Sequence, residues 1–314
     1  MEEQARDVIN ELAQQIDSEP VDAKIELDES TGGYHIYKEK YGRKLKIDET
    51  ISNIRKFLDE GNNIVPLVID YFGKPKIKEA DLRSYPPVHK ISGYTTYYGT
   101  HDSPNRIHNI RLIASWINNT LMMPGETLSL VNKVGAFTEE RGFKEAYVIS
   151  GGVLVPQLGG GTCQIGTTLY NAAALADLNI ISRRNHSFYF NIYPLGRDAT
   201  VYPGSADFKF QNDTGHPILI KTVATNRKLS FRIYGTPTSK EVEFSPPAIY
   251  LLYSDGVFRP ATLGQVIASD APFRTIIKRT VKKEGKVIKE ETIRSYYKLY
   301  GEKSNVPIKR FESR

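Results

Sequence analysis

The stretch GGGTCQ at residues 159–164, with the apolar run that continues to residue 176, decides how the centre of this chain folds. Three consecutive glycines permit dihedral angles and close approaches that residues with a Cβ resist. The run 164–176 has helical periodicity, and its apolar face carries Ile165, Leu169, Ala172, Ala173 and Ala176. This pattern predicts a helix with Cys163 at its N-terminus, where free N–H groups and the helix dipole favour a thiolate. The same N–H groups are suited to stabilise an oxyanion.

Cys163 is the only cysteine among the 314 residues, so it cannot form a disulfide within its chain. Two interpretations stay open: a nucleophile at a helix N-terminus, or a small buried hydrophobic residue. A phosphate-binding loop is disfavoured, because GGGTCQIGTT lacks the lysine of a P-loop and the spacing of a dinucleotide fingerprint. No metal site is expected, because no histidine or carboxylate lies at ligand spacing from the thiol.

The composition is that of an ordinary soluble globular protein, with 40% hydrophobic and 25% charged residues and a net charge of +6. Basic residues are interspersed with acids and no nucleic-acid-binding motif is present, so no nucleic-acid partner is expected. No apolar run approaches the roughly 20 residues that span a bilayer. The first residues, MEEQAR, do not resemble a secretory signal. The chain is therefore either a soluble cytoplasmic protein or the soluble part of an anchored one, and we expect a monomer.

Turn signals divide the chain into three modules, residues 1–86, 87–237 and 238–314, and the predicted class is a multi-module α+β protein. The first module is a small α+β unit. Its predicted helices and strands are Ala5–Ile16, Glu49–Glu60 with Asp48 as N-cap, Ala23–Asp28, Tyr34–Lys40, Lys44–Ile47 and Asn63–Tyr71.

The second module is predicted to be mixed α+β and the third a small all-β unit. Besides the Cys163 helix, the elements predicted for the second module are Asn105–Asn118, Leu128–Val131, Ile180–Ile192, Ala206–Phe210, Pro217–Val223 and Leu229–Tyr234. The strands 206–210 and 217–223 flank the turn 212–215, which predicts a hairpin. The third module has the predicted strands Glu241–Phe244, Ile249–Tyr253, Arg274–Lys282 and Lys286–Tyr297.

The second module carries a series of motifs in fixed order: NRIHNI (105–110), MPGETLSL (123–130), the stretch 159–173, NHS (185–187), PLGRDATV (194–201) and DFKFQN (207–212). In these motifs it resembles the VanW domain family of Gram-positive bacterial envelope proteins. The first module resembles the peptidoglycan-binding unit that often precedes VanW domains. The third is similar to a small extracellular β module that often follows them.

The resemblance implies an activity, because some VanW-domain proteins are understood to act as L,D-transpeptidases that form 3→3 peptidoglycan cross-links through a cysteine. It implies that Cys163 attacks the carbonyl of the third residue of a tetrapeptide stem and expels the terminal D-Ala. A side-chain amine of a diamino acid on a neighbouring stem then captures the thioester. The implied partners are stem peptides and glycan strands, with no cofactor. The implied location is extracytoplasmic, with the membrane reached only through an anchor absent from this chain.

Acyl transfer needs a base near the thiol, and we expect His186 to supply it. His186 lies in the family's His-Ser motif and in the predicted strand 180–192, which can return alongside the start of the Cys163 helix. His101 and His108 are weaker candidates, and His216 lies in a predicted turn.

The other expected site residues lie in or beside the matched motifs. Asp198 or Asp207 is the expected third catalytic group, which fixes the imidazole tautomer, although either could instead cap a turn. Arg184 and Arg197 are candidates to hold a substrate carboxylate by bidentate pairing. The remaining expected substrate-binding residues surround the thiol: Gly160, Gly161, Thr162 and Gln164.

Two alternatives to a transpeptidase stay open. If water captures the thioester, the same cysteine makes the chain a peptidoglycan carboxypeptidase or endopeptidase. If Cys163 is only packed, the chain is a non-catalytic wall-binding protein.

Overall fold

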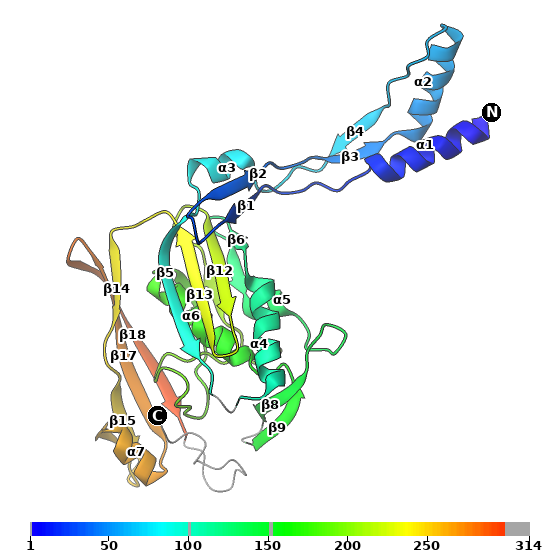
Figure 1. Ribbon diagram of the computed structural model, residues 1–314. Helices are drawn as coiled ribbons and strands as arrows, with labels where there is room; N and C mark the ends of the chain where they lie inside the picture. Colours follow the sequence, from blue (N-terminus) through cyan, green and yellow to red (C-terminus); the bar gives the residue numbers. More distant parts are fainter. Residues whose placement is uncertain (1, 100–101, 151–152, 299–314) are drawn as a thin grey trace. The chain divides into compact units, whose positions relative to one another are not determined.

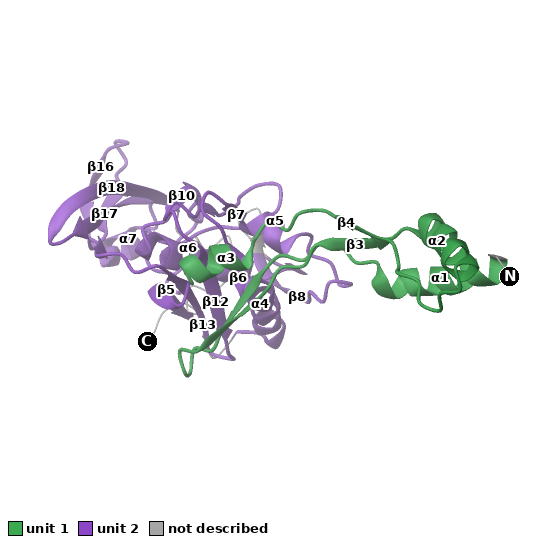
Figure 2. Cartoon of the chain, turned by 90° about the horizontal axis from the view of Figure 1, so that it is seen from above, with its two compact units in different colours: residues 1–86 green, residues 87–314 purple. Residues whose placement is uncertain are grey.

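The computed structural model describes residues 2–99, 102–150 and 153–298 (Figure 1). The chain divides into two compact units, residues 1–86 and 87–314 (Figure 2). Both units combine helices with antiparallel strands, which confirms the predicted α+β class. The further boundary expected after residue 237 lies inside unit 2 and stays a prediction. Among the described helices, none has the length and apolar character needed to cross a membrane.

The described residues of unit 1 form three helices and two two-stranded sheets. Its elements are α1 (Glu2–Ile16), β1 (Lys24–Leu27), β2 (Tyr34–Tyr37), β3 (Gly42–Leu45), α2 (Ile47–Asp59), β4 (Ile69–Phe72) and α3 (Glu79–Ser84). β1 pairs with β2, and β3 pairs with β4. The helices α1 and α2 bury their apolar faces in a small core with Ile9, Ala13, Leu45 and Ile51.

The start of α2 lies two residues before the predicted start at Glu49. The helix begins at Ile47 with Lys46 as N-cap, so Asp48 lies inside its first turn. There the negative charge of Asp48 interacts favourably with the positive end of the helix dipole. The carboxylate also forms an ion pair with Arg6 at 2.8 Å.

Unit 2 is built around a four-stranded antiparallel sheet in the order β5-β13-β12-β6, against which α4 and α6 pack (Figure 1). These elements are β5 (His89–Tyr97), α4 (Pro104–Ile117), β6 (Thr120–Met122), α6 (Thr162–Leu175), β12 (Ile218–Ala224) and β13 (Lys228–Gly235). Alternation along β13 buries Leu229, Phe231 and Ile233 completely. Because α4 and α6 share this core, the start of α6 is held by packing on two sides.

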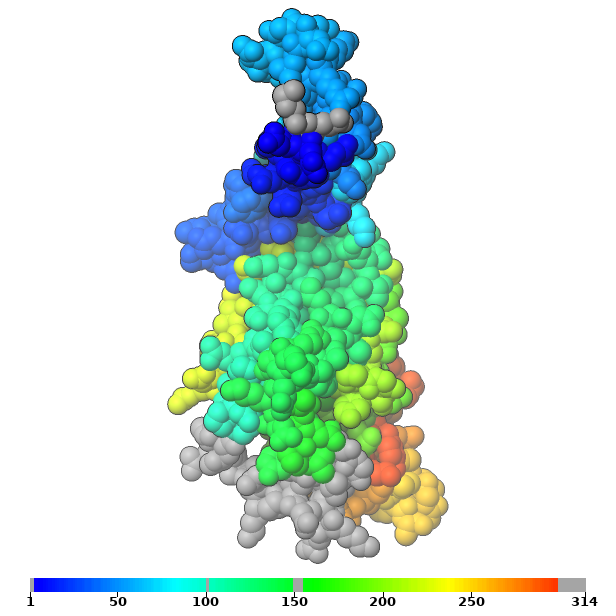
Figure 3. Space-filling model, turned by 90° about the vertical axis from the view of Figure 1, so that its right-hand side faces the viewer, coloured from blue at the N-terminus to red at the C-terminus, as the bar shows by residue number. Residues whose placement is uncertain are grey.

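The rest of the central region is a three-stranded sheet, β10-β11-β7, a short helix and a hairpin. The elements are β7 (Thr127–Ser129), α5 (Leu130–Val134), β8 (Glu145–Ser150), β9 (Val153–Leu158), β10 (Asn179–Ser182) and β11 (Lys209–Gln211). On the side drawn in Figure 3, cyan-green and green segments that include α4 and the β8–β9 hairpin cover unit 2.

Two strand predictions in this region are wrong. The predicted strand 180–192 ends at Ser182, because the backbone N–H of His186 donates to the Asp198 carboxylate instead of to a strand. The predicted hairpin 206–223 does not form, since β11 pairs with β7 and β10 while β12 pairs with β13 and β6. The side chain of Asn212 separates the two strands by donating to the carbonyl oxygens of Met122 and His216.

The C-terminal part of unit 2 is a five-stranded sheet centred on β17. Its elements are β14 (Lys240–Phe244), β15 (Ala248–Leu252), β16 (Phe258–Ala261), α7 (Leu263–Ser269), β17 (Phe273–Lys283) and β18 (Lys286–Tyr297). β18 pairs along the whole of β17, whereas β14 and β15 share its other edge. The helix α7 is an addition to the predicted elements and begins with a capping box between Thr262 and Gln265.

Candidate active site

The first turn of α6 brings Cys163 to the surface of unit 2. Residues 162–174 of α6 are all buried except Cys163, which is partly exposed. Gly161 caps the helix in a left-handed conformation with φ +110°, and a Cβ there would lie 3.2 Å from the carbonyl oxygen of Arg106. Only glycine meets both conditions easily, so the glycines before Cys163 let α6 begin directly against α4.

The first turn also offers a free backbone donor beside the thiol. The N–H of Thr162 donates to the Gly159 carbonyl, and that of Gln164 to the Gly161 carbonyl. For the N–H of Cys163, no hydrogen-bond partner is found within the part of the chain that the structure describes. This group is suited to stabilise negative charge on an oxygen next to the sulfur.

A polar stripe on α6 holds the segment 197–201 along the helix. Asn171 donates to the Arg197 carbonyl at 2.8 Å, and the Thr167 hydroxyl accepts the N–H of residue 199 at 2.9 Å. One turn earlier, the sulfur of Cys163 accepts the N–H of Val201 at 3.5 Å. Because these three side chains are spaced four residues apart, they lie on one face of α6. Their contacts with residues 197–201 therefore fix the position of Asp198 relative to Cys163.

Cys163, His186 and Asp198 form a series in which the imidazole lies between the thiol and the carboxylate. Nδ1 of His186 lies 2.6 Å from Oδ2 of Asp198, and the same oxygen accepts the backbone N–H of His186 at 2.7 Å. The imidazole of His186 also lies close enough to Cys163 for each side chain to shift the pKa of the other. Since Nδ1 is taken by the carboxylate, Nε2 is the nitrogen left for the sulfur. This is the connectivity of a cysteine nucleophile, its base and an orienting acid.

The electrostatics of this series favour the charged form of each group. Burial alone would raise the pKa of Cys163, but the charge and hydrogen bond of His186 outweigh it and lower the pKa. Burial also opposes the imidazolium, yet the Cys163 charge and the Asp198 hydrogen bond raise the pKa of His186 to about 9. Burial of Asp198 is likewise outweighed by His186, so its pKa is lowered. The arrangement therefore favours an ion pair between the Cys163 thiolate and the His186 imidazolium beside an ionised Asp198.

Aromatic rings and an arginine enclose the imidazole. Tyr193 stacks on His186 with centroids 5.2 Å apart, and Phe190 meets it edge-on at 5.2 Å. Arg106 lies near the hydroxyl of Tyr193, and it donates to the amide oxygen of Gln164 at 2.6 Å. Arg106 thereby connects α4, α6 and the loop that carries the imidazole.

The four residues expected to line the site beside Cys163 differ in burial. Gly161 is the cap described above, whereas Gly160, Thr162 and Gln164 are buried. The amide of Gln164 is fully engaged, because it accepts from Arg106 and donates to Thr96 and to a backbone carbonyl. The side chain of Gln164 therefore holds Arg106 in place.

Of the two expected acids, the structure brings only Asp198 to the thiol and imidazole. Asp207 accepts the Ser129 hydroxyl at 2.6 Å and the N–H of Val131 at 2.9 Å, so it secures the start of α5. That is the capping alternative considered for both acids.

The backbones of the two expected arginines lie at different distances from Cys163. The carbonyl of Arg184 accepts the N–H of Thr200, next to Val201, which contacts Cys163. Its side chain is exposed and donates to one carbonyl at 3.3 Å. Arg197 is held at Asn171, eight residues after Cys163, which is roughly 12 Å along a helix that rises 1.5 Å per residue.

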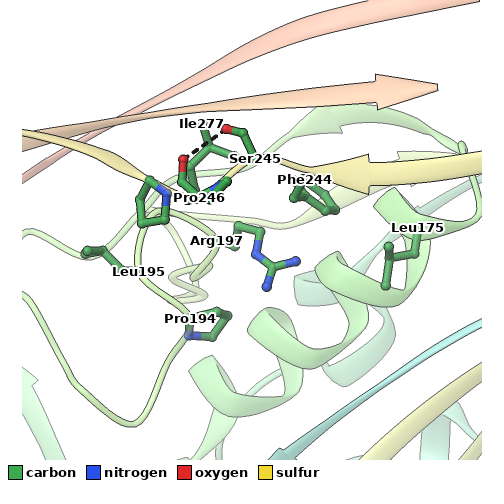
Figure 4. A pocket seen from close by; sticks show the side chains of 9 residues that line it. Leu175, Pro194, Leu195, Arg197, Phe244, Ser245, Pro246 and Ile277 are labelled. Atoms are coloured by element: carbon green, nitrogen blue, oxygen red, sulfur yellow. Dashed lines mark hydrogen bonds between the residues drawn. The ribbon is translucent and has the colours of Figure 1, made fainter. Parts of the chain in front are cut away.

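Arg197 lines a pocket of about 460 Å³ together with Leu175, Pro194, Leu195, Phe244, Ser245, Pro246, Pro247 and Ile277 (Figure 4). Its guanidinium lies 4.6 Å from the centroid of Phe244 and 5.6 Å from that of Tyr94. The guanidinium of Arg197 is therefore engaged in this pocket, and its backbone lies about two helical turns of α6 away from Cys163.

The other histidines lie in different surroundings. Nε2 of His108 is 2.8 Å from the Gly142 carbonyl, and the His216 carbonyl accepts from Asn212. His101 lies outside the described residues.

Sequence reasoning missed four residues that surround the series: Arg106, Arg183, Tyr193 and Tyr297. Arg106 had a usable signal, because it lies in the motif NRIHNI. The stripe Cys163, Thr167 and Asn171 had another, since three polar side chains recur along this helix at intervals of four residues. Tyr297 had none, as its partner Asp198 is 99 residues away in the sequence.

Together, the two units and the cysteine-centred site define a class of protein: a chain with a candidate thiol acyl-transfer site. A family model described as "VanW like protein" matches residues 105–234. A second, described as "Putative peptidoglycan binding domain", matches residues 2–65. No solved structure matches the chain.

Two relatives support the first match. The Bacillus subtilis (strain 168) protein YoaR is 32% identical over 228 residues, which are 63% of this chain and 75% of that protein. The vancomycin B-type resistance protein VanW of Enterococcus faecalis (strain ATCC 700802 / V583) is 27% identical over 158 residues, 49% of this chain and 55% of that protein. The chain belongs to the VanW family, and its peptidoglycan-binding domain makes it a cell-wall-related protein.

Proposed function

We propose that this chain is an extracytoplasmic L,D-transpeptidase that forms 3→3 peptidoglycan cross-links through Cys163. The observation that carries the proposal is the series Cys163–His186–Asp198 at the partly exposed start of α6, in which His186 is hydrogen-bonded to Asp198 and electrostatically coupled to Cys163. Membership of the VanW family and the peptidoglycan-binding domain support the choice of stem peptides as substrate.

The first half of the reaction is acylation of the sulfur. The Cys163 thiolate attacks the carbonyl carbon of the third stem residue, and the negative charge moves to the carbonyl oxygen. The free N–H of Cys163 and the positive end of the α6 dipole stabilise this oxyanion. As the carbon–nitrogen bond breaks, the His186 imidazolium gives its proton to the leaving amine of D-Ala. The products are a thioester on Cys163, neutral His186 and free D-Ala.

The second half transfers the acyl group to an amine. The side-chain amine of a diamino acid on a second stem attacks the thioester carbonyl, and His186 accepts the proton that the amine loses. Collapse of the oxyanion expels the Cys163 thiolate and restores the thiolate–imidazolium pair. Asp198 stays ionised throughout and keeps Nδ1 of His186 protonated, so that Nε2 faces the reacting atoms.

Arg184 is the residue we assign to the carboxylate of the terminal D-Ala. Its backbone is fixed at Thr200, next to the residue that contacts the sulfur, while its guanidinium is exposed. A guanidinium pairs with a carboxylate through two parallel hydrogen bonds, which also orients the peptide bond to be cleaved.

The experiment incubates the purified chain with disaccharide tetrapeptides and follows the products by mass spectrometry. We expect released D-Ala, a covalent adduct on Cys163 and cross-linked dimers, and none of these with a folded Cys163→Ala variant. Dimers formed by that variant would eliminate the mechanism. Shortened stems without dimers would indicate a carboxypeptidase or endopeptidase. A thiol that an electrophile labels no faster than free cysteine would indicate a non-catalytic wall-binding protein.

A further inference from the structure

The buried carboxylate behind His186 is held from a part of the chain far away in sequence. Oδ1 of Asp198 accepts the hydroxyl of Tyr297, the last residue of β18, at 2.5 Å. Arg183 approaches the same oxygen at 3.3 Å. Tyr297 is 1% exposed and Asp198 is 3% exposed, so the hydrogen bond between them is shielded from water.

The same strand holds the loop around this carboxylate. The hydroxyl of Tyr297 also accepts the N–H of Gly196 at 3.1 Å. Two residues earlier on β18, the hydroxyl of Ser295 accepts from Arg183 at 3.0 Å. β18 therefore fixes Asp198 directly and through the arginine beside it.

The neighbouring strand holds the other end of the helix that carries the thiol. Arg279 of β17 is 2% exposed, and its Nε and Nη2 donate to the carbonyl of Ala174 at 3.0 and 2.8 Å. It also pairs with Asp177 at 2.8 Å. A cation here hydrogen-bonds a carbonyl of the last turn of α6 and interacts favourably with the negative end of the helix dipole. Because α6 is rigid, fixing this end also fixes Cys163 at the opposite end.

The chemistry of the Tyr297 contact exceeds what packing requires. A phenylalanine would fill the same space, and Tyr297 already stacks on Phe273 with centroids 5.2 Å apart. A buried carboxylate, however, stays ionised only when donors surround it. His186 supplies two donors to one oxygen of Asp198, and Tyr297 supplies the shorter of two contacts to the other. Burial and the Asp198 charge raise the pKa of Tyr297, so its hydroxyl keeps its proton and donates.

We propose that the C-terminal sheet completes the active site, with Tyr297 as a positioning residue that holds Asp198 ionised and oriented behind His186. The proposal rests on the proposed role of Cys163 and extends it by making a strand outside the VanW-matched residues 105–234 part of the machinery. The C-terminal sheet therefore has a role in the active site, because without Tyr297 the carboxylate of Asp198 lacks one of its hydrogen-bond donors.

The test measures the rate at which iodoacetamide alkylates Cys163 in the full chain as a function of pH. In Tyr297→Phe, the carboxylate of Asp198 loses its shortest hydrogen bond and is protonated at higher pH. The imidazolium of His186 and the thiolate of Cys163 are then less stabilised. One charge-assisted hydrogen bond corresponds to a shift of roughly one pH unit. The acid limb should therefore move upward by about that amount, a roughly tenfold slower alkylation on that limb. The matched control is Tyr296→Phe, whose ring is 44% exposed on the opposite face of β18 and which should match the wild type.

A folded Tyr297→Phe variant with an acid limb at the wild-type pH overturns the proposal. If that variant does not fold, Ser295→Ala decides, because it removes the hydroxyl that contacts Arg183 and Gly196 but leaves Tyr297 in place, and it should move the limb in the same direction by less. An unmoved limb in Ser295→Ala then overturns it. The readout is independent of cross-linking: a shifted limb without dimers refutes the proposed reaction alone, whereas dimers with an unshifted limb refute the positioning role alone.

Discussion

Replacing Asp198 by asparagine tests the proposed relay most directly. The carboxylate accepts from His186 twice, from Tyr297 and from Arg183, and all of these partners are donors. An asparagine keeps the shape but carries an amide nitrogen, which must point at one of these donors. The variant therefore loses both the negative charge and at least one hydrogen bond.

The size of the effect follows from the hydrogen bond that is lost. The Cys163 charge and the Asp198 hydrogen bond raise the pKa of His186 to about 9 against the opposing effect of burial. A charge-assisted hydrogen bond is worth about 1.5–3 kcal/mol. At 1.36 kcal/mol per unit, removing it should lower the pKa of His186 by about 1–2 units. Because the imidazolium is needed to protonate the leaving amine, activity should be lost on the alkaline side at correspondingly lower pH.

The assay is the pH dependence of kcat/KM for dimer formation, supported by an NMR titration of the His186 ring. In the wild type the alkaline limb should fall near pH 9, and in Asp198→Asn it should fall about 1–2 units lower. Asp207→Asn is the control, because its carboxylate caps α5, and it should leave the limb in place. A folded Asp198→Asn variant with an unchanged alkaline limb refutes the reasoning. If only Asp207→Asn shifts the limb, Asp207 is the acid that orients His186.

The remaining predictions concern the start of α6 and the substrate carboxylate. Gly161→Ala should destabilise the protein by about 2–4 kcal/mol in urea unfolding, because it combines left-handed strain with a close approach to α4. Gly125→Ala, at φ +83° with no atom within 4 Å, should cost only about 1–2 kcal/mol, and equal losses would contradict the packing argument. Arg184→Ala should raise the KM for a tetrapeptide by about tenfold with little change in Cys163 alkylation. Arg197→Ala should change that KM less than twofold, and the reverse order would assign the carboxylate to the pocket of Arg197.

The sequence predicted local features well where their cause is local. The helix that begins beside Cys163 follows from its apolar face and from the glycines before it, and α6 spans Thr162–Leu175. The antiparallel strand pair β17–β18 follows from alternation on both sides of the turn at Glu284. In each case residues a few positions apart supply the energy that selects the conformation.

The errors arose where a distant partner selected the conformation. Alternation suggested a strand over 180–192, but the backbone at His186 turns to meet a carboxylate twelve residues later. The pattern around residues 206–223 suggested a hairpin, but β11 and β12 found better partners in different sheets. A short strand has little preference of its own, so the neighbours that cover its faces and edges decide its pairing.

By itself, the amino-acid sequence determined that one cysteine begins a buried helix and that an imidazole and two carboxylates follow it in the chain. Only the tertiary structure decided which carboxylate meets the imidazole, that the N–H of Val201 contacts the sulfur, and that Tyr297 donates to the carboxylate of Asp198. The physical reason is that a hydrogen bond depends on tenths of an ångström between groups that the chain alone leaves far apart. Packing of α6 against the central sheet, and of Arg279 against its far end, sets those distances.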